Sequence, residues 1–440
     1  MTAITPPTGR IDVLRWPDLA PMRASVRSHV ESTVARALFH GAVRRLPVRV
    51  ELADGAVWGA GAPGSPTMQI HRPAEFFRRV GADKLIGFGE SYMAGDWDAQ
   101  DLGGFLTELG RHISTLVPEP LQKLRALVVA RHPEAERGAE ENTRDNIARH
   151  YDLSNDMFAT FLDETMTYSS ALFADPPRTA RSTISRATVA SAPDPGVPTG
   201  ADLVPAQRRK LDRLLDQTGV GPGTRVLEIG TGWGELCIRA ALRGATVRSV
   251  TLSSEQKALA EERIAAAGLS DRVTVDLLDY RAVDGEYDAV VSVEMIEAVG
   301  YEFWPTYFEK IDSLLAPGGK AAIQAITMPH DRMMATRSTY TWVHKYIFPG
   351  GFLPSVKAID EITRHRTTMR ISDRLSMGLH YAETLRLWDQ QFLDQQEEVH
   401  ALGFDSVFDR MWHFYLEYSR AGFASRYIDV QQITFARDEA

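Results

Sequence analysis

One nine-residue stretch decides the fold: Val226-Leu227-Glu228-Ile229-Gly230-Thr231-Gly232-Trp233-Gly234. Its apolar first half predicts a buried strand. Its three glycines predict a sharp turn that brings the backbone close to a ligand at the start of a helix. The spacing differs from the dinucleotide-binding pattern, because Glu235 stands where that pattern has its third glycine. Glu228, on the strand itself, suits a cofactor with a positively charged amino-acid end.

Strands and amphipathic helices alternate along the chain from Arg208 onward. The pattern predicts strands at 224–230, 246–252, 272–277, 287–293 and 320–326, and helices at 235–241, 255–267 and 301–315. This alternation indicates an α/β fold with a parallel, doubly wound sheet. Together with Leu314–Gly319 before the fifth strand, the glycine turn resembles the Rossmann-like class I methyltransferase fold, which binds S-adenosylmethionine.

Composition limits the class of protein. The 440 residues include 49 Lys and Arg against 58 Asp and Glu, a net charge of −9, and 44% are hydrophobic. These values indicate a globular protein of two or three domains, and the acidic balance argues against nucleic acid as a partner. A single cysteine, Cys237, excludes an internal disulfide framework and a multi-cysteine zinc site. Without an apolar run of membrane-spanning length or a signal peptide, we expect a cytoplasmic protein.

The chain divides into five predicted parts. They are a mobile tail (1–21), a smaller N-terminal α+β domain (22–135), helices that close over the cofactor (136–175), a proline-rich mobile loop (176–205), and a methyltransferase domain (206–440) with an acyl-binding insertion around 330–400. The loop has no aromatic residue and cannot bury enough apolar area to order itself. Whether it acts as a lid stays open.

The N-terminal domain begins with a predicted helix at 22–46 that has two interpretations. Its apolar residues recur at helical spacing, which favours packing on its own domain. Its arginines accompany a single acid, Glu31, which suits a helix lying on an anionic lipid surface. A hairpin is predicted at Val48–Trp58, followed by helical sequence over 74–110 with a break at Gly87–Glu90.

Several further blocks carry a family resemblance. They are His150–Phe158, Tyr168-Ser169, Thr251–Ser253 with Gln256, Lys345–Gly351 with Leu353–Ser355, and Gly87–Met93 with Gly95–Asp98. Together they resemble the cyclopropane-fatty-acyl-phospholipid synthase family, which includes the mycolic acid cyclopropane synthases and methyltransferases. The resemblance covers roughly residues 75–435, and the last two blocks resemble the N-terminal domain of the phospholipid-acting branch.

The resemblance implies a reaction and its catalytic residues. The π electrons of a cis double bond in an acyl chain attack the methyl group of S-adenosylmethionine, and the resulting carbocation loses a proton to a bound bicarbonate ion. Glu297, Tyr381 and the backbone of Ile326 match family positions around that ion. Ser170 and Gln324 stand where cysteine and histidine are usual. Glutamine can donate a hydrogen bond but cannot titrate near neutral pH as histidine does.

The glycine turn and the resemblance together predict the cofactor site. Its residues are Tyr168, Ser169, Glu228, Gly230, Thr231, Gly232, Trp233, Gly234, Thr251, Leu252, Ser253, Gln256, Asp279 and Tyr280. The acid that usually ends the second strand and holds the ribose is absent. The residues there, Thr251–Gln256, match the family's own ribose-side segment.

The product depends on the fate of the carbocation. Direct proton loss from the transferred methyl closes a cyclopropane ring, whereas a prior hydride shift leaves a methylene branch that a separate reductase could turn into a methyl. Because Ser170 and Gln324 alter the surroundings of the base, we expect branching, as in the family's tuberculostearate-type branch. Ring formation, methylation of a small polar molecule, and an inactive lipid-binding homologue are the alternatives.

The expected partners follow from that reaction. The substrate is an unsaturated, oleoyl-type phospholipid in a bilayer, so the protein is expected to associate peripherally with the inner face of the membrane. The resemblance also implies a homodimer.

Overall fold

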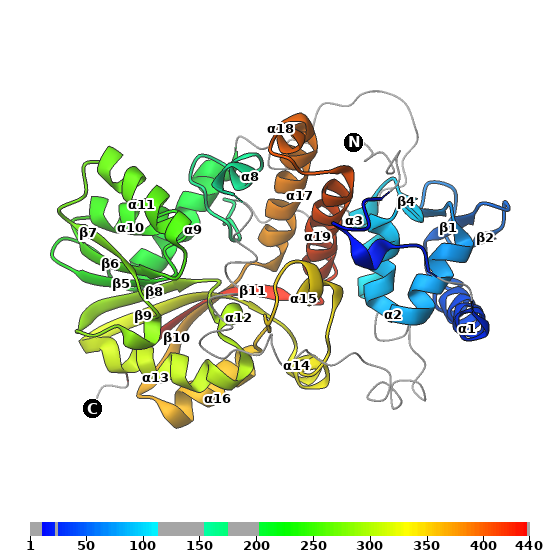
Figure 1. Ribbon diagram of the computed structural model, residues 1–440. Helices are drawn as coiled ribbons and strands as arrows, with labels where there is room; N and C mark the ends of the chain where they lie inside the picture. Colours follow the sequence, from blue (N-terminus) through cyan, green and yellow to red (C-terminus); the bar gives the residue numbers. More distant parts are fainter. Residues whose placement is uncertain (1–10, 23–24, 113–153, 175–201, 438–440) are drawn as a thin grey trace.

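The computed structural model describes residues 11–22, 25–112, 154–174 and 202–437 (Figure 1). They form a seven-stranded sheet in the order β10-β11-β9-β8-β5-β6-β7 and a four-stranded sheet in the order β2-β1-β3-β4. The first part of the predicted tail, all of 113–153 and nearly all of the predicted proline-rich loop lie outside the described residues. The domain boundaries predicted there stay a prediction.

The larger sheet is built around the glycine turn. Its strands are β5 (Arg225–Ile229), β6 (Thr246–Thr251), β7 (Val273–Leu277), β8 (Tyr287–Val293), β9 (Leu315–Thr327), β10 (Met369–Ser376) and β11 (Asp429–Arg437). Strands β5 to β9 run parallel, which confirms the predicted α/β sheet, and β10 and β11 add an antiparallel edge. The strand order reverses between β5 and β8, where open sheets bind ligands at the carboxyl ends of their strands.

Helices cover both faces of this sheet (Figure 1). One apolar core joins the sheet to α9 (Leu203–Gln217), α10 (Glu235–Leu242) and α11 (Ser254–Ala266). Another joins it to α13 (Trp304–Leu314) and α16 (Val356–Arg366), with α12 (Ile296–Val299) and the short helices η4 (Tyr280–Ala282) and η5 (Tyr301–Phe303) nearby.

One predicted boundary near these layers is wrong. Helix α9 begins at Leu203, inside the predicted loop, because the Leu203 side chain is buried in the apolar core. Within the predicted acyl-binding insertion, α16 covers the sheet and β10 forms its edge, since both contribute buried residues to the core under the sheet.

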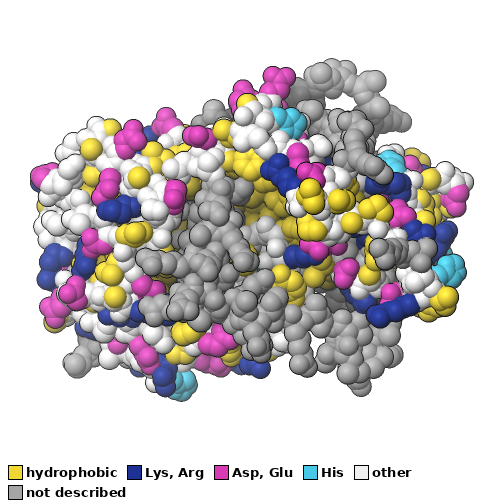
Figure 2. All heavy atoms as spheres, viewed as in Figure 1, with side chains coloured by type: hydrophobic (Ala, Val, Ile, Leu, Met, Phe, Trp, Pro, Cys, Tyr) yellow, Lys and Arg dark blue, Asp and Glu magenta, His cyan; other side chains and the backbone are white. Residues whose placement is uncertain are grey.

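A third apolar core connects the two halves of the molecule. It contains residues of α17 (Gly378–Asp394) and α19 (Ser406–Ala424), which pack side by side, and of the N-terminal sheet. The shorter helices η1 (Pro17–Leu19), α8 (Asn155–Ala159), α15 (Trp342–Tyr346) and α18 (Gln396–Ala401) contribute to it, whereas α14 (His330–Thr336) packs on α16 through the core under the sheet. Figure 2 shows hydrophobic side chains gathered between the two halves.

The N-terminal part is α+β, as predicted. Its elements are α1 (Val26–Val43), β1 (Arg49–Leu52), β2 (Val57–Trp58), β3 (Thr67–Ile70), α2 (Pro73–Met93), β4 (Trp97–Ala99) and α3 (Leu102–Arg111). Strands β1 and β2 form the predicted hairpin. The sequence pattern did not predict β4, which separates α2 from α3.

The predicted break at Gly87–Glu90 is wrong, because α2 runs through these residues and departs from helical geometry at Lys84, with φ of 54°. The glycines serve close packing instead. A Cβ atom on Gly87 would lie 2.1 Å from the carbonyl oxygen of Arg79, and one on Gly89 would lie 2.4 Å from the indole ring of Trp342. Helix α2 can therefore approach α15 of the other half closely.

Helix α1 does not bury its apolar stripe. Val26, Val30, Val34 and Leu38 are 86%, 56%, 52% and 51% exposed, and the helix is buried through other positions, such as Ala35 and Val43. Packing of α1 on the N-terminal domain therefore does not account for the helical spacing of these four apolar residues. No helix among the described residues is long and apolar enough to cross a membrane.

Candidate active site

The glycine turn has the geometry that a ligand requires. Gly230, Gly232 and Gly234 have φ values of 95°, 52° and 90°, which residues with side chains rarely adopt. Gly234 is the N-cap of α10, and a Cβ atom added to Gly232 would meet no atom within 4 Å. The turn therefore leaves open space beside a helix N-terminus, which fits a cofactor bound at the carboxyl end of β5.

Glu228 supports this turn from inside the protein. Its carboxylate accepts a hydrogen bond from Ser249 Oγ at 2.6 Å, and Ser249 Oγ is in turn 2.7 Å from Thr231 Oγ1. Burial raises the pKa of Glu228 to about 8, so the carboxyl group is largely neutral at pH 7. Its direct interaction with a positive cofactor group stays a prediction.

The predicted ribose-side segment, Thr251–Gln256, lies next to the residues that follow β7, Asp279 and Tyr280 among them. Ser253 caps α11 by accepting from the Gln256 amide, and Gln256 Oε1 accepts from Thr251 Oγ1 at 3.2 Å. A small cavity of about 30 Å³ is lined by Leu252, Asp279, Tyr280, Arg281, Met295, Ala298 and Val299. Three of the residues predicted to bind the cofactor thus meet at one cavity.

An acid and a tyrosine of that cavity have shifted pKa values. Burial acts to raise the pKa of Asp279, but hydrogen bonds from Arg281 outweigh it and lower the value. Burial raises the pKa of Tyr280 to about 12. At neutral pH the cavity therefore presents one ionised carboxylate and one neutral phenol.

Aromatic side chains border the glycine turn on the side of α8. The Trp233 indole donates to Asn155 Oδ1 at 2.8 Å, and its ring lies 5.0 Å from that of Phe158. The Tyr168 ring is 5.1 Å from Phe158 and 5.3 Å from Trp388. The structure therefore brings Tyr168 and Trp233 together in one apolar cluster, as the cofactor prediction requires.

A carboxylate that the sequence analysis missed lies at the centre of the predicted catalytic residues. Glu294, directly after β8, accepts hydrogen bonds from the Ser170 amide at 3.0 Å, from Gln324 Nε2 at 2.7 Å and from the Tyr381 hydroxyl at 2.8 Å. Its φ of 49° is unusual for a residue with a side chain. Three distant segments therefore converge on Glu294.

Glu297 forms the other part of the site. Its Oε1 accepts from the Ile326 amide, and its buried Oε2 has no hydrogen-bond partner among the described residues. Burial, followed by the charge of Glu294, raises the pKa of Glu297 to about 8. Burial also raises the pKa of Glu294, against the lowering effect of its hydrogen-bond donors and of Lys210.

The site does not fit the predicted bicarbonate ion. Ser170, Gln324 and Tyr381 already donate to Glu294, and the Ile326 amide already donates to Glu297. A further anion would lie beside the Glu294 carboxylate and the Glu297 carboxyl group without these donors, which is unfavourable in a buried site. Glu294 could have been found in the sequence, since it is an acid at a strand end in the same block as Glu297.

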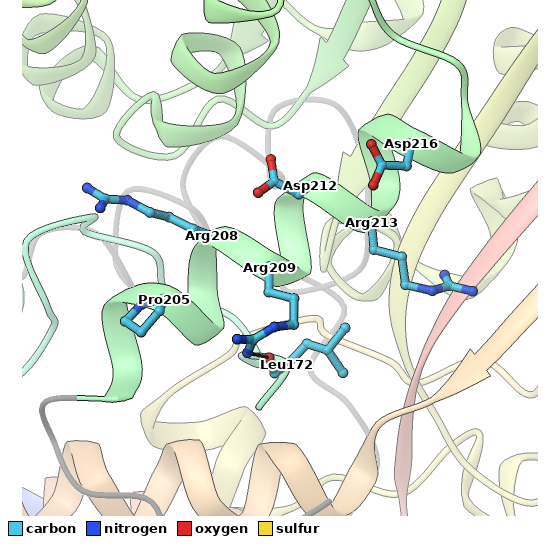
Figure 3. A pocket seen from close by; sticks show the side chains of 7 residues that line it. All are labelled: Leu172, Pro205, Arg208, Arg209, Asp212, Arg213 and Asp216. Carbon is cyan, nitrogen blue, oxygen red and sulfur yellow. Dashed lines mark hydrogen bonds between the residues drawn. The ribbon is translucent and has the colours of Figure 1, made fainter. Parts of the chain in front are cut away.

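A separate groove beside α9 carries mostly charged side chains (Figure 3). It is lined by Leu172, Pro205, Arg208, Arg209, Asp212, Arg213 and Asp216. Arg209 donates to the Leu172 carbonyl oxygen, and Arg213 to Gln432 and Asp373. None of the predicted site residues lines this groove.

Comparison with known proteins identifies the family of the chain. Residues 139–433 match the family described as mycolic acid cyclopropane synthetase. The tuberculostearic acid methyltransferase UfaA1 of Mycobacterium tuberculosis is 52% identical over 432 residues, which cover 98% of this chain and 97% of that protein. The cyclopropane-fatty-acyl-phospholipid synthase of Escherichia coli is 32% identical over 82% of this chain and 86% of its own.

Two solved structures each resemble about two thirds of the chain. The cyclopropane synthase MmaA2 from Mycobacterium tuberculosis is 28% identical with a TM-score of 0.56, and covers 67% of this chain and 98% of its own. The mycolic acid cyclopropane synthase CmaA1, complexed with SAH and CTAB, is 29% identical with the same TM-score and coverage. The chain therefore belongs to the mycolic acid cyclopropane synthetase family and is an S-adenosylmethionine-dependent methyltransferase.

Proposed function

We propose that this protein adds a methylene branch to the cis double bond of an unsaturated acyl chain in a phospholipid. The observation that carries the proposal is the Glu294 carboxylate, which takes the place predicted for bicarbonate and accepts from Ser170, Gln324 and Tyr381. The 52% identity to a tuberculostearic acid methyltransferase over nearly the whole chain supports the branched product.

S-adenosylmethionine, when bound, supplies the electrophilic methyl group, whose bond to sulfur breaks with its electrons staying on sulfur, so that S-adenosylhomocysteine is the leaving group. The alkene π electrons form the new carbon–carbon bond, which leaves a cation on the neighbouring carbon. A hydride then moves to that carbon from the carbon bearing the new methyl. Glu294 removes a proton from the methyl, whose C–H electrons form the double bond of the methylene branch. Its carboxylate becomes a carboxylic acid, so charge and atoms balance.

The chain favours this chemistry electrostatically. Two carboxyl groups, Glu294 and Glu297, belong to one turn after β8, and an ionised carboxylate stabilises a nearby cation most in a water-poor site. The raised pKa of Glu294 also makes it a stronger base than an exposed glutamate. Tyr381 holds the carboxylate in place.

Aromatic residues near Tyr168 supply the apolar surroundings. Phe158, Phe161, Trp388 and Trp412 are buried, and their rings lie within about 6 Å of one another or of Tyr168. Such rings exclude water that would capture the cation, and their π faces stabilise positive charge. This supports an acyl chain, rather than a small polar molecule, as the substrate.

Access to the substrate requires contact with a membrane surface. The exposed stripe of α1 and the exposed arginines that follow the helix, Arg44 and Arg45, support peripheral binding to an anionic bilayer on its cytoplasmic face. Figure 2 shows basic side chains at the end of the molecule that carries α1. We also propose a homodimer and a separate reductase that converts the methylene branch into a methyl.

Identification of the product distinguishes methylene branching from ring closure. Purified protein is incubated with S-adenosylmethionine and oleoyl-phospholipid vesicles, and the fatty acids are identified by mass spectrometry. Both products gain one CH₂, so fragmentation of the chains is needed to distinguish them. A methylene-branched chain is expected. A cyclopropane ring would instead support the activity named for the Escherichia coli relative, and unmodified lipid would contradict both.

A further inference from the structure

Lys210 on α9 is a charged residue inside the protein core that the proposed chemistry does not yet use. It is 0% exposed, and the one hydrogen bond of its side chain among the described residues runs from Nζ to Ser169 Oγ, at 2.5 Å. Burying an ammonium group with a single hydroxyl partner is unfavourable unless negative charge lies nearby. The position of Lys210 therefore requires an explanation beyond packing.

The side chain of Lys210 holds the segment that leads to Glu294. Ser169, its hydroxyl partner, immediately precedes Ser170, whose amide donates to Glu294. One helical turn before Lys210, Gln207 Nε2 donates to the Ser169 carbonyl oxygen at 2.9 Å. Helix α9 thus fixes both the backbone and the side chain of Ser169.

The backbone of Lys210 is tied to the same site through two glutamines. Gln432 Nε2, on β11, donates to the Lys210 carbonyl oxygen at 2.9 Å and to Gln324 Oε1 at 3.1 Å. Gln324 uses its own Nε2 to donate to Glu294 at 2.7 Å. The side chain of Lys210 is therefore linked to Glu294 through Ser169 and its neighbour Ser170. The backbone of Lys210 is linked to Glu294 through Gln432 and Gln324.

We propose that Lys210 is a positioning residue for Glu294: it anchors Ser169 and supplies the buried positive charge that balances the Glu294 carboxylate. This inference rests on the proposed function of Glu294 as the base. The charges acting on Lys210 come from Glu294, Asp163 and Glu235. Those acting on Glu294 come from Lys210 and from Glu297, and Tyr381 is its titratable hydrogen-bond donor.

The effect of removing the Lys210 charge on turnover follows from the pKa shifts of Lys210 and Glu294. Burial lowers the pKa of Lys210 to about 8, so at pH 7 the ammonium is mostly protonated and lowers the pKa of Glu294. Without that charge the pKa of Glu294 rises further. A larger fraction of the base is then protonated at neutral pH, and turnover requires a higher pH.

The test compares Lys210→Met and Lys210→Gln with wild type. Methionine removes the charge and the hydrogen bond, whereas glutamine can still donate to Ser169 without a charge. Removing one partner of a buried charge pair destabilises a protein, so Lys210→Met is expected to unfold at a lower urea concentration than wild type, and Lys210→Gln, which keeps a donor to Ser169, carries the test if Lys210→Met does not fold. The exposed Lys357→Met, on α16, is the matched control.

Two measurements are made at each pH. The first is kcat on oleoyl-phospholipid vesicles. The second is the infrared C=O band of the protonated Glu294 carboxyl group, assigned with Glu294→Gln. Both Lys210 variants are expected to move both titrations to higher pH. Because a higher Glu294 pKa leaves less of the base ionised, kcat at neutral pH is expected to fall several-fold, by up to about tenfold. The Lys357→Met profile is expected to match wild type.

The results separate this proposal from the proposed function. Wild-type titrations in Lys210→Met, or their restoration by Lys210→Gln, would overturn the charge-balancing role. If wild type modifies no lipid, the proposed function fails, and the infrared titration still decides whether Lys210 controls the protonation of Glu294.

Discussion

Tyr381 on α17 donates its hydroxyl hydrogen to Glu294 Oε2 at 2.8 Å, although 87 residues separate the two in the sequence. Burial, together with the charge of Glu294, raises the pKa of Tyr381 well above its usual value. The phenol therefore stays protonated and remains a donor at neutral pH. A helix that lies outside the parallel sheet thus orients the carboxylate at the end of β8.

Removal of this donor should weaken the base. In Tyr381→Phe the aromatic packing stays and the hydrogen bond to Glu294 is lost. Because hydrogen bonds to charged groups contribute about 1.5–3 kcal/mol, kcat should fall about 10- to 100-fold, with the acid limb of its pH profile moved to higher pH. Steady-state kinetics across pH would measure both. Tyr418→Phe on α19 is the control, and equal losses in the two variants would contradict the role of Tyr381.

Replacement of Glu294 itself should remove the base while keeping its shape. Glu294→Gln retains an acceptor for the surrounding donors but cannot take a proton at neutral pH. Loss of a general base lowers turnover by about 10²- to 10⁴-fold, and binding of S-adenosylmethionine measured by calorimetry should be nearly unchanged. The exposed Glu302→Gln is the matched control. Full activity of Glu294→Gln with added bicarbonate would show that an ion acts as the base.

Glu297 should make stability depend on pH. Its pKa is raised from 4.5 to about 8 in the folded protein, so the folded state binds more protons than the unfolded chain between these values. Folding stability contributed by this group is present below pH 4.5 and is lost as pH rises to about 8. Glu297→Gln should therefore gain stability relative to wild type as pH rises, by about 4 kcal/mol between pH 4.5 and pH 8. Urea unfolding at pH 5 and 8 measures the difference; a constant difference would refute the raised pKa.

Glu90 should couple the two halves of the molecule. It is 3% exposed on α2 and accepts from Lys345 Nζ at 2.7 Å and from the Tyr346 hydroxyl at 2.9 Å. Glu90→Ala leaves the lysine without this partner and should lower the free energy of unfolding by about 3 kcal/mol. With Lys345→Met added, the combined loss should be smaller than the sum of the single losses. Additive losses in urea unfolding would mean that the pair is not coupled.

The exposed stripe of α1 should contribute to vesicle binding. Val30→Asp and Val34→Asp change side chains that are more than half exposed, so the free energy of unfolding should stay within about 0.5 kcal/mol of wild type. Binding to anionic phospholipid vesicles should fall, because apolar area is lost and negative charge is added at the surface. Co-sedimentation measures binding, with Lys357→Asp on α16 as the control. Unchanged binding would leave α1 without a membrane role.

Local patterns predicted the sheet well and the N-terminal helices less well. The glycines at 230, 232 and 234 require positive φ values, and apolar runs such as β8 are buried on both faces, so both signals are contained in short segments. The predicted break at Gly87–Glu90 is wrong because glycine is required there for close packing, against Arg79 on the same helix and against Trp342 on α15. A local pattern of glycines does not show which residues pack against them.

The sequence by itself determined the α/β sheet, the cofactor turn and the family of this protein, because these depend on short-range periodicity and on residues in fixed order. Only the tertiary structure decided how the predicted catalytic residues are arranged. Ser170, Gln324 and Tyr381 meet at Glu294 because three distant segments pack together there, and hydrogen bonds between such segments leave no periodic signal in the sequence.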